Sequence, residues 1–222
     1  LFLTLTGRND WDSALAGTKH ESFFYPSVGM SAIISQMVQL PEFISYMKVR
    51  GSWASVGSAI SPNIASRWRY EYNPASQSYS TVTYKFPETF YPERTNSWEA
   101  GLTARFFDNA LTLDVTFYQS NTRKQTFLRP ITVGEGYSKE YVQTGNVRNR
   151  GLELSLGYNK TWGDFTWNSS LTYSMNRNKI IDLLEDPNEV ISQAGLNGAN
   201  VILKKGGTMG DVYTYTDFAR DN

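Results

Sequence analysis

Apolar and polar residues alternate with a period of two along most of this chain, which is typical of β-strands whose two faces meet different surroundings. The alternation is clearest from Phe165 to Met175, where every second residue except Ser169 is apolar. The pattern predicts no regular helix, and Ile180–Leu184 is the one stretch compatible with a short helical turn. The pattern predicts an all-β chain of about eight strands, the others being Leu1–Thr6, Phe24–Ile34, Tyr46–Ser55, Ser97–Phe106, Leu111–Tyr118, Leu152–Tyr158 and Asp211–Asp217.

Alternation of this kind occurs both in soluble β-sandwiches and in membrane barrels, so the lengths of strands and connections must separate them. Many of the expected strands have about ten residues, the length that a tilted strand needs to cross a membrane. Long connections (7–21, 56–95, 119–147 and 176–210) alternate with short ones (35–45, 107–110 and 159–164). This order favours a transmembrane antiparallel up-and-down barrel, with short turns in the periplasm and long loops outside.

The shortest connection contains Asp108 and Asn109, two residues that tolerate the left-handed backbone of a tight hairpin. Closing the hairpin there predicts a register that places every apolar residue of both strands on one face. The predicted pairs on that face are Phe106 with Leu111, Leu102 with Val115 and Ala100 with Phe117. On the other face Thr103 is expected opposite Asp114, with Arg105 diagonal to it.

Composition narrows the possible partners of this chain. Its 222 residues carry 21 Lys+Arg against 21 Asp+Glu, and this balance argues against nucleic acid as a partner. The sequence contains no run of basic residues of the kind that would predict binding to an anionic lipid surface. The uncharged window 22–41 contains Pro26 and Gly29 and is too polar for a spanning helix. Because the chain begins within an alternating pattern, we expect it to be an internal piece of a longer protein.

The sequence offers no set of residues for catalysis, for a cofactor or for a metal. It has no cysteine and one histidine, His20, which we expect in a polar loop. A serine nucleophile elbow and the glycine-rich nucleotide motifs are absent, so we expect no enzyme activity and no bound cofactor. Asp10 and Asp12 are too few for a calcium loop, and we expect them in a turn.

Several motifs together resemble the barrel of SusC/RagA-type TonB-linked outer-membrane transporters. They occur in the family's order and cover nearly the whole chain except the loop 58–94. The motifs are GRNDWDSAL (Gly7–Leu15), YPSVGMSAIIS (Tyr25–Ser35), MKVRGSWASVG (Met47–Gly57), TNSWEAGLTARFFDNALTLDVTFYQSNTR (Thr95–Arg123), GNVRNRGLELSLGYN (Gly145–Asn159) and GGTMGDVYTYTDF (Gly206–Phe218).

The resemblance implies a large barrel in the Gram-negative outer membrane, with an N-terminal plug that contacts TonB across the periplasm. It also implies import of glycans or peptides with a SusD-like surface lipoprotein as lid. Residues 1–222 would then be a partial barrel domain of an energy-coupled importer, without the plug and the closing C-terminal strands.

Two groups of residues are candidates for contact with a substrate. Glu99, Arg105, Asp114 and Glu153 are expected to face the lumen, as substrate or plug contacts or as a charge-balanced wall. The loop 58–94 is rich in aromatic residues, which stack on sugar rings or pack on a lid protein, or pack on one another. The loop candidates for substrate or lid contact are Trp68, Tyr70, Tyr72, Tyr79 and Tyr84.

A separate set of aromatic residues, Trp53, Trp98, Trp162 and Trp167, suits the girdle of a membrane barrel. Two further functions stay open on the sequence alone. One is a small complete outer-membrane barrel that acts as an adhesin or anchor. The other is a soluble carbohydrate-binding β-sandwich.

Overall fold

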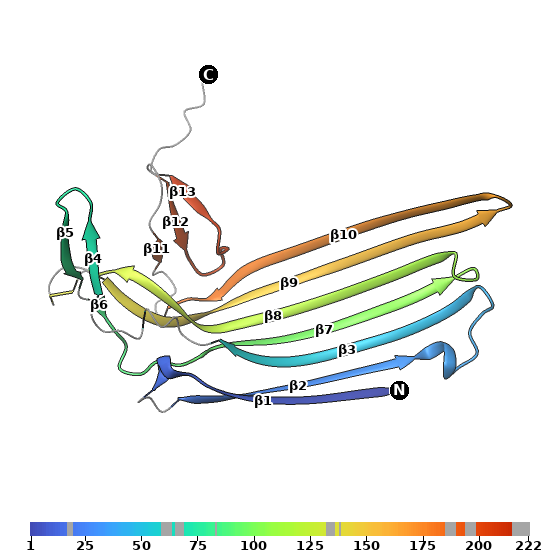
Figure 1. Cartoon of the computed structure of the whole chain (residues 1–222), viewed down its shortest axis with the longest axis horizontal. Coiled ribbons are helices and arrows are strands. Elements are labelled where there is room, and N and C mark those ends of the chain that lie inside the picture. The colour runs from blue at the N-terminus through green and yellow to red at the C-terminus, as the bar shows by residue number, and fades with distance from the viewer. Residues whose placement is uncertain are drawn as a thin grey trace, which may run out of the picture.

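The computed structural model describes residues 1–16, 20–58, 64, 69–82, 84–131, 136–137, 139–184, 190–193 and 199–214. Its main feature is one curved antiparallel sheet whose long strands follow one another in chain order (Figure 1). This confirms the all-β, up-and-down prediction. The strands are β1 (Phe2–Trp11), β2 (Ser22–Ile33), β3 (Ile44–Ser58), β7 (Glu93–Phe106), β8 (Leu111–Pro130), β9 (Lys139–Trp162) and β10 (Phe165–Asp182).

Three small groups of strands lie outside this series. The two-residue strand β6 (Tyr84–Lys85) pairs in parallel with β9 and makes the main sheet eight-stranded. A hairpin of β4 (Arg69–Asn73) and β5 (Ser78–Val82) forms a second sheet, and β11 (Ile191–Gln193), β12 (Ala199–Leu203) and β13 (Val212–Thr214) form a third. No sheet packs face to face on the main one in the described part, unlike a sandwich (Figure 1).

The connections divide between the two ends of the sheet. At one end lie 34–43, which contains the 3₁₀ helix η2 (Ile34–Gln36), and the turns 107–110 and 163–164. At the other end lie 12–21, with η1 (Ser13–Leu15), and the segments that carry β4–β6 and β11–β13 (Figure 1). The predicted alternation of lengths holds only in part, because 12–21 and 34–43 are equally long.

The predicted β7–β8 register is confirmed. Phe106 pairs with Leu111, Leu102 with Val115 and Thr103 with Asp114. Asp108 and Asn109 have φ values of 55° and 67°, and the Ala110 N–H donates to the Phe107 carbonyl oxygen at 3.0 Å. The two residues therefore take the left-handed backbone that the hairpin requires.

Three sequence expectations need correction. Strands β8 and β9 continue through most of the segment 119–147 that we expected to be a loop. The helical turn at Ile180–Leu184 is wrong, since Ile180 belongs to β10 and pairs with Val147. The strand expected at Asp211–Asp217 begins as β13 in the third sheet, not the main one, and residues 215–217 lie outside the described ranges.

The largest apolar core lies where β8–β10 approach the third sheet. Burial there removes apolar surface from water, and this fixes the third sheet against the ends of the long strands. The core residues are Phe127, Val147, Ile180, Leu183, Ile191 and Leu203.

In the described part, no helix is long and apolar enough to span a membrane.

Candidate functional site

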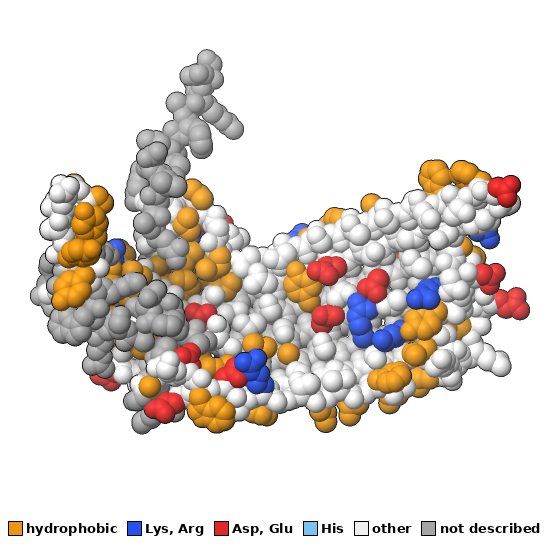
Figure 2. All heavy atoms as spheres, in the orientation of Figure 1, with side chains coloured by type: hydrophobic (Ala, Val, Ile, Leu, Met, Phe, Trp, Pro, Cys, Tyr) orange, Lys and Arg blue, Asp and Glu red, His pale blue; other side chains and the backbone are white. Residues whose placement is uncertain are grey.

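One face of the main sheet carries a network of charged and hydroxyl side chains around Arg50 of β3. The Arg50 guanidinium donates to both carboxylate oxygens of Asp114 on β8, at 2.9 and 3.2 Å. It also donates to Thr103 Oγ1 at 3.0 Å, and the Thr103 hydroxyl donates to Asp114 at 2.6 Å. Figure 2 shows this face, with basic and acidic side chains gathered near its middle.

Gly101 of β7 makes room for this network. It lies opposite Arg50 in the register, and a Cβ at this position would lie 2.6 Å from Arg50 Cζ and Nε. The guanidinium therefore lies across the backbone of β7 and reaches Asp114 on the next strand. A neighbouring acid, Glu99, completes the cluster with an oxygen 3.7 Å from Arg50 Nε.

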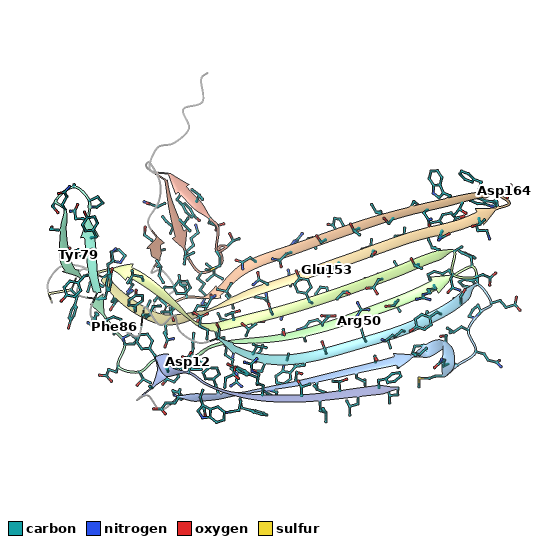
Figure 3. The ribbon with its side chains drawn as sticks, in the orientation of Figure 1. Asp12, Arg50, Tyr79, Phe86, Glu153 and Asp164 are labelled. Carbon is teal, nitrogen blue, oxygen red and sulfur yellow. The ribbon has the colours of Figure 1, made fainter. Side chains whose placement is uncertain are left out.

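The four predicted lumen-facing residues do not form a single cluster. Glu99 and Asp114 share Arg50. Glu153 lies apart from Arg50 on β9 (Figure 3), and it lines a pocket of about 290 Å³ that Asp114 also lines. Arg105 is not part of the network, because its guanidinium lies over the Tyr46 ring, 5.3 Å from the ring centroid.

Sequence reasoning missed Arg50 as the centre of the network. Its partners come from β7 and β8, which follow β3 only after the long connection that contains β4–β6. The one local signal is that Arg50 shares the polar face of its strand with Lys48 and Ser52. That signal does not say which cation meets Asp114.

Three of the predicted loop aromatics lie exposed on the β4–β5 hairpin. Tyr70 and Tyr79 are 71% and 72% exposed, and Tyr72 is 51% exposed. The rings of Tyr72 and Tyr79 lie 5.1 Å apart across the hairpin, which projects from the end of the sheet that carries the longer segments (Figure 3). Trp68 lies outside the described residues.

Tyr84 differs from the other loop candidates because its side chain is 4% exposed. Its ring packs at 5.5 Å from that of Tyr141 on β9, and Phe86 stacks on the same tyrosine at 5.3 Å. Farther along, the side-chain amide of Gln143 bonds both backbone groups of Tyr91 at 2.7 Å. In this conformation Tyr84 anchors the loop and presents no ring surface to a ligand.

The remaining candidates are distributed along the sheet. Trp53 and Trp98 are register partners on β3 and β7, and Trp162 and Trp167 lie exposed beside the turn 163–164. The His20 ring packs against the Tyr91 ring at a tilt of 37°, with centroids 4.4 Å apart, and His20 lines a pocket of about 730 Å³. The described residues bring together no His, Cys, Asp or Glu group that could hold a metal.

Comparison with known proteins gives consistent matches. The family described as "TonB dependent receptor-like, beta-barrel" matches residues 1–216. TonB-dependent receptor P26 of Formosa agariphila is 30% identical over 190 residues, which are 82% of this chain and 19% of that protein. TonB-dependent receptor SusC of Bacteroides thetaiotaomicron is 26% identical over 190 residues, 78% of this chain and 19% of SusC.

A solved structure of the RagAB peptide importer in its open-open state has the same fold. It superposes with a TM-score of 0.73 at 22% identity and covers 93% of this chain and 22% of that one. A second RagAB peptide transporter structure gives a TM-score of 0.66 at 21% identity. The chain spans about a fifth of the length of these relatives.

Proposed function

The chain belongs to the TonB-dependent receptor-like β-barrel family, whose members are outer-membrane proteins, and we propose that it forms part of an energy-coupled importer. In this role it supplies a section of the barrel wall and its external loops. The substrates are oligosaccharides or oligopeptides. The separation of the two sheet faces carries the proposal, because one face bears the Arg50 network and the other a continuous apolar band.

We propose that residues 1–222 are one section of a larger barrel domain, with a plug and the closing strands elsewhere in the protein. The sheet order leaves β1 and β10 as edges. Residues 165–174 of β10 are exposed on both faces, as expected of a strand that pairs with a further neighbour. The same edges disfavour a small complete barrel that serves as an adhesin or anchor.

The lumenal network suits passage of polar solutes. Asp114, Glu153 and the hydroxyls around them offer hydrogen-bond acceptors and donors of the kind that sugars and peptides exchange with water. The Arg50–Asp114 pair holds opposite charges together, so this part of the wall has no strong field of one sign. We propose that Glu99 and Asp114 act mainly through Arg50, and that Glu153 is free to contact a solute.

The β4–β5 hairpin is our candidate for first contact with a substrate or with a SusD-like lipoprotein lid. Tyr70, Tyr72 and Tyr79 present exposed rings, and ring stacking contributes about 0.5–1.5 kcal/mol beyond burial. Trp68 belongs to this proposal by its place in the sequence, whereas Tyr84 serves it as an anchor. Coupling to TonB would pass through the plug, which is outside this chain.

We infer that the chain has no catalytic role. The relatives that it matches are named as receptors. Its single histidine is the one base that a serine triad could use, and its ring packs on Tyr91.

The test replaces Tyr70 and Tyr79 with Ala in the full-length protein and measures surface expression, uptake of labelled oligosaccharides and peptides, and copurification of the lipoprotein. The matched control replaces Phe43 and Phe107, two exposed rings at the opposite end of the sheet, with Ala. We expect both variants to reach the surface. Uptake or lipoprotein binding should fall about tenfold in the tyrosine variant only. Wild-type values for both would reject the hairpin's role.

A further inference from the structure

The face of the sheet opposite Arg50 is organised in rows of residues that are register partners across β3 and β7–β10. Three successive rows consist of apolar residues and glycine. This is the banded surface that a barrel presents to the hydrocarbon of a membrane. The rows are Met47–Ala104–Leu113–Leu156–Leu171, Val49–Leu102–Val115–Leu154–Tyr173 and Gly51–Ala100–Phe117–Leu152–Met175.

The next three rows on the same face, toward the end with the longer segments, change character. They contain six cations and one acid, Asp182, which forms an ion pair with Lys205 at 3.7 Å. We call them the cation rows. The rows are Trp53–Trp98–Gln119–Arg150–Arg177, Ser55–Asn96–Asn121–Arg148–Lys179 and Gly57–Arg94–Arg123–Asn146–Asp182.

The six cations form three pairs of like charge that lie directly opposite each other on neighbouring strands. Arg150 pairs with Arg177, Arg148 with Lys179, and Arg94 with Arg123. Like charges in direct cross-strand register destabilise a sheet. Within the described residues, none of the six has a carboxylate within ion-pair distance, and all but Arg148 are exposed. An anion from outside the chain would offset this repulsion.

We propose that the cation rows bind the phosphate groups of anionic lipids in the outer leaflet of the membrane. The rows lie directly beyond the apolar band, and Trp53 and Trp98 share the first row, as interfacial aromatics do. Short turns mark the periplasmic end of such barrels, so the opposite end, where the rows lie, reaches the outer leaflet. Arginine binds phosphate with two parallel hydrogen bonds. Five of the six cations are arginines, which supports phosphate as the ligand.

This inference rests on the membrane location of the family and does not depend on the substrate of the importer. The first experiment uses the full-length protein in nanodiscs of phosphatidylcholine with added lipid A, and native mass spectrometry counts the lipids that stay bound. Replacing Arg150 and Arg177 with Gln should lower bound lipid A about fivefold per cation removed. Replacing both with Lys should retain part of the binding, because the charge is kept while the paired hydrogen bonds of arginine are lost.

The matched control is Lys48→Gln with Arg105→Gln, which removes two cations from the other face of the sheet. It should leave lipid A binding at the wild-type level. Equal binding in all variants, or an equal loss in the control, would overturn the proposal. Migration of the folded barrel on unheated gels shows whether each variant has folded.

A charge reversal gives a second readout. Arg177→Glu places a carboxylate opposite Arg150, so the melting temperature in a neutral detergent should rise, while the further rise on adding lipid A should shrink. An unchanged melting temperature together with an unchanged response to lipid A contradicts the proposal. The same melting experiment is repeated with inorganic phosphate in place of lipid A. If phosphate raises the melting temperature of the wild-type protein as much as lipid A does, the site binds phosphate and not lipid.

Discussion

Replacing Gly101 with Ala should displace the Arg50 guanidinium without removing any charge from the protein. The new methyl group would lie 2.6 Å from Arg50 Cζ and Nε, well inside contact distance. The atoms that must move are the far end of a flexible side chain, so the backbone can stay in place. We therefore expect the variant to fold and to lose the bidentate contact between Arg50 and Asp114.

Two effects of opposite sign set the size of the change. Hydrogen bonds to charged groups contribute about 1.5–3 kcal/mol when buried, and exposed ion pairs about 0.2–1 kcal/mol. The side chains of Arg50 and Asp114 are 30% and 41% exposed, so we expect an intermediate loss of about 1–2 kcal/mol. Alanine gains about 0.5–1 kcal/mol over glycine within a strand. The net loss in the free energy of unfolding should be about 0.8 kcal/mol, within a range of about 0–1.5 kcal/mol.

The background Arg50→Ala separates the two effects. Without the guanidinium the methyl group meets no obstacle, so Gly101→Ala should stabilise this variant by about 0.5–1 kcal/mol. Urea unfolding of the full-length protein in lipid vesicles, followed by tryptophan fluorescence, measures all four proteins. If Gly101→Ala has the same sign in both backgrounds, or the two changes add to within about 0.5 kcal/mol, the reasoning is wrong.

Two further predictions concern other parts of the chain. Single cysteines placed in the full-length protein at Thr103, Asp114, Glu153 and Ser170 should react with a membrane-impermeant thiol reagent. Cysteines placed at Leu102, Leu113, Leu154 and Leu171 should not react. The reverse pattern would invert the proposed faces. In the loop that carries β12 and β13, hydrogen bonds from the Thr208 hydroxyl and N–H lower the pKa of Asp211. The pKa of Asp211 is therefore lower in the folded protein than in the unfolded chain. The ionised Asp211 side chain contributes fully to stability at pH values above the ordinary carboxyl pKa, and this contribution is lost as the pH falls through the lowered pKa. Pepsin cleavage of the wild-type protein within 199–214 should therefore increase only at the acid end of a pH series. The Asp211→Asn variant should be cleaved throughout the series. Equal pH profiles for the two proteins would refute the role of Asp211.

The sequence predicts the sheet best where its two faces meet different surroundings. The register of β7 and β8 can be predicted because Leu102 and Val115 must lie on the same face of the sheet. A slip of one residue would place them on opposite faces. Beyond the apolar band neither face is uniformly apolar, so the alternation disappears and the upper parts of β8 and β9 cannot be recognised from it.

Tertiary contacts explain the other differences between prediction and structure. The apolar run at Ile180–Leu184 suits a helical turn by itself, but Ile180 and Leu183 are buried in the core at the ends of β8–β10. The Arg50 network likewise depends on three strands, and only their register shows that Arg50 rather than Arg105 meets Asp114. Residues that act through cross-strand contacts leave little trace in a local pattern.

Charge balance over the whole chain conceals how the charges are arranged in space. With 21 basic and 21 acidic residues and no basic run, the sequence gives no reason to expect an anionic lipid partner. The strand register gathers Arg94, Arg123, Arg148, Arg150, Arg177 and Lys179 on one face, while Glu99, Asp114 and Glu153 lie on the other. Arg50 on the polar face contacts the carboxylates of Asp114 and Glu99, whereas within the described residues none of the six cations above the apolar band forms an ion pair. In a strand, a basic surface is therefore built from alternate residues of several segments, and a search for consecutive lysines and arginines does not detect it.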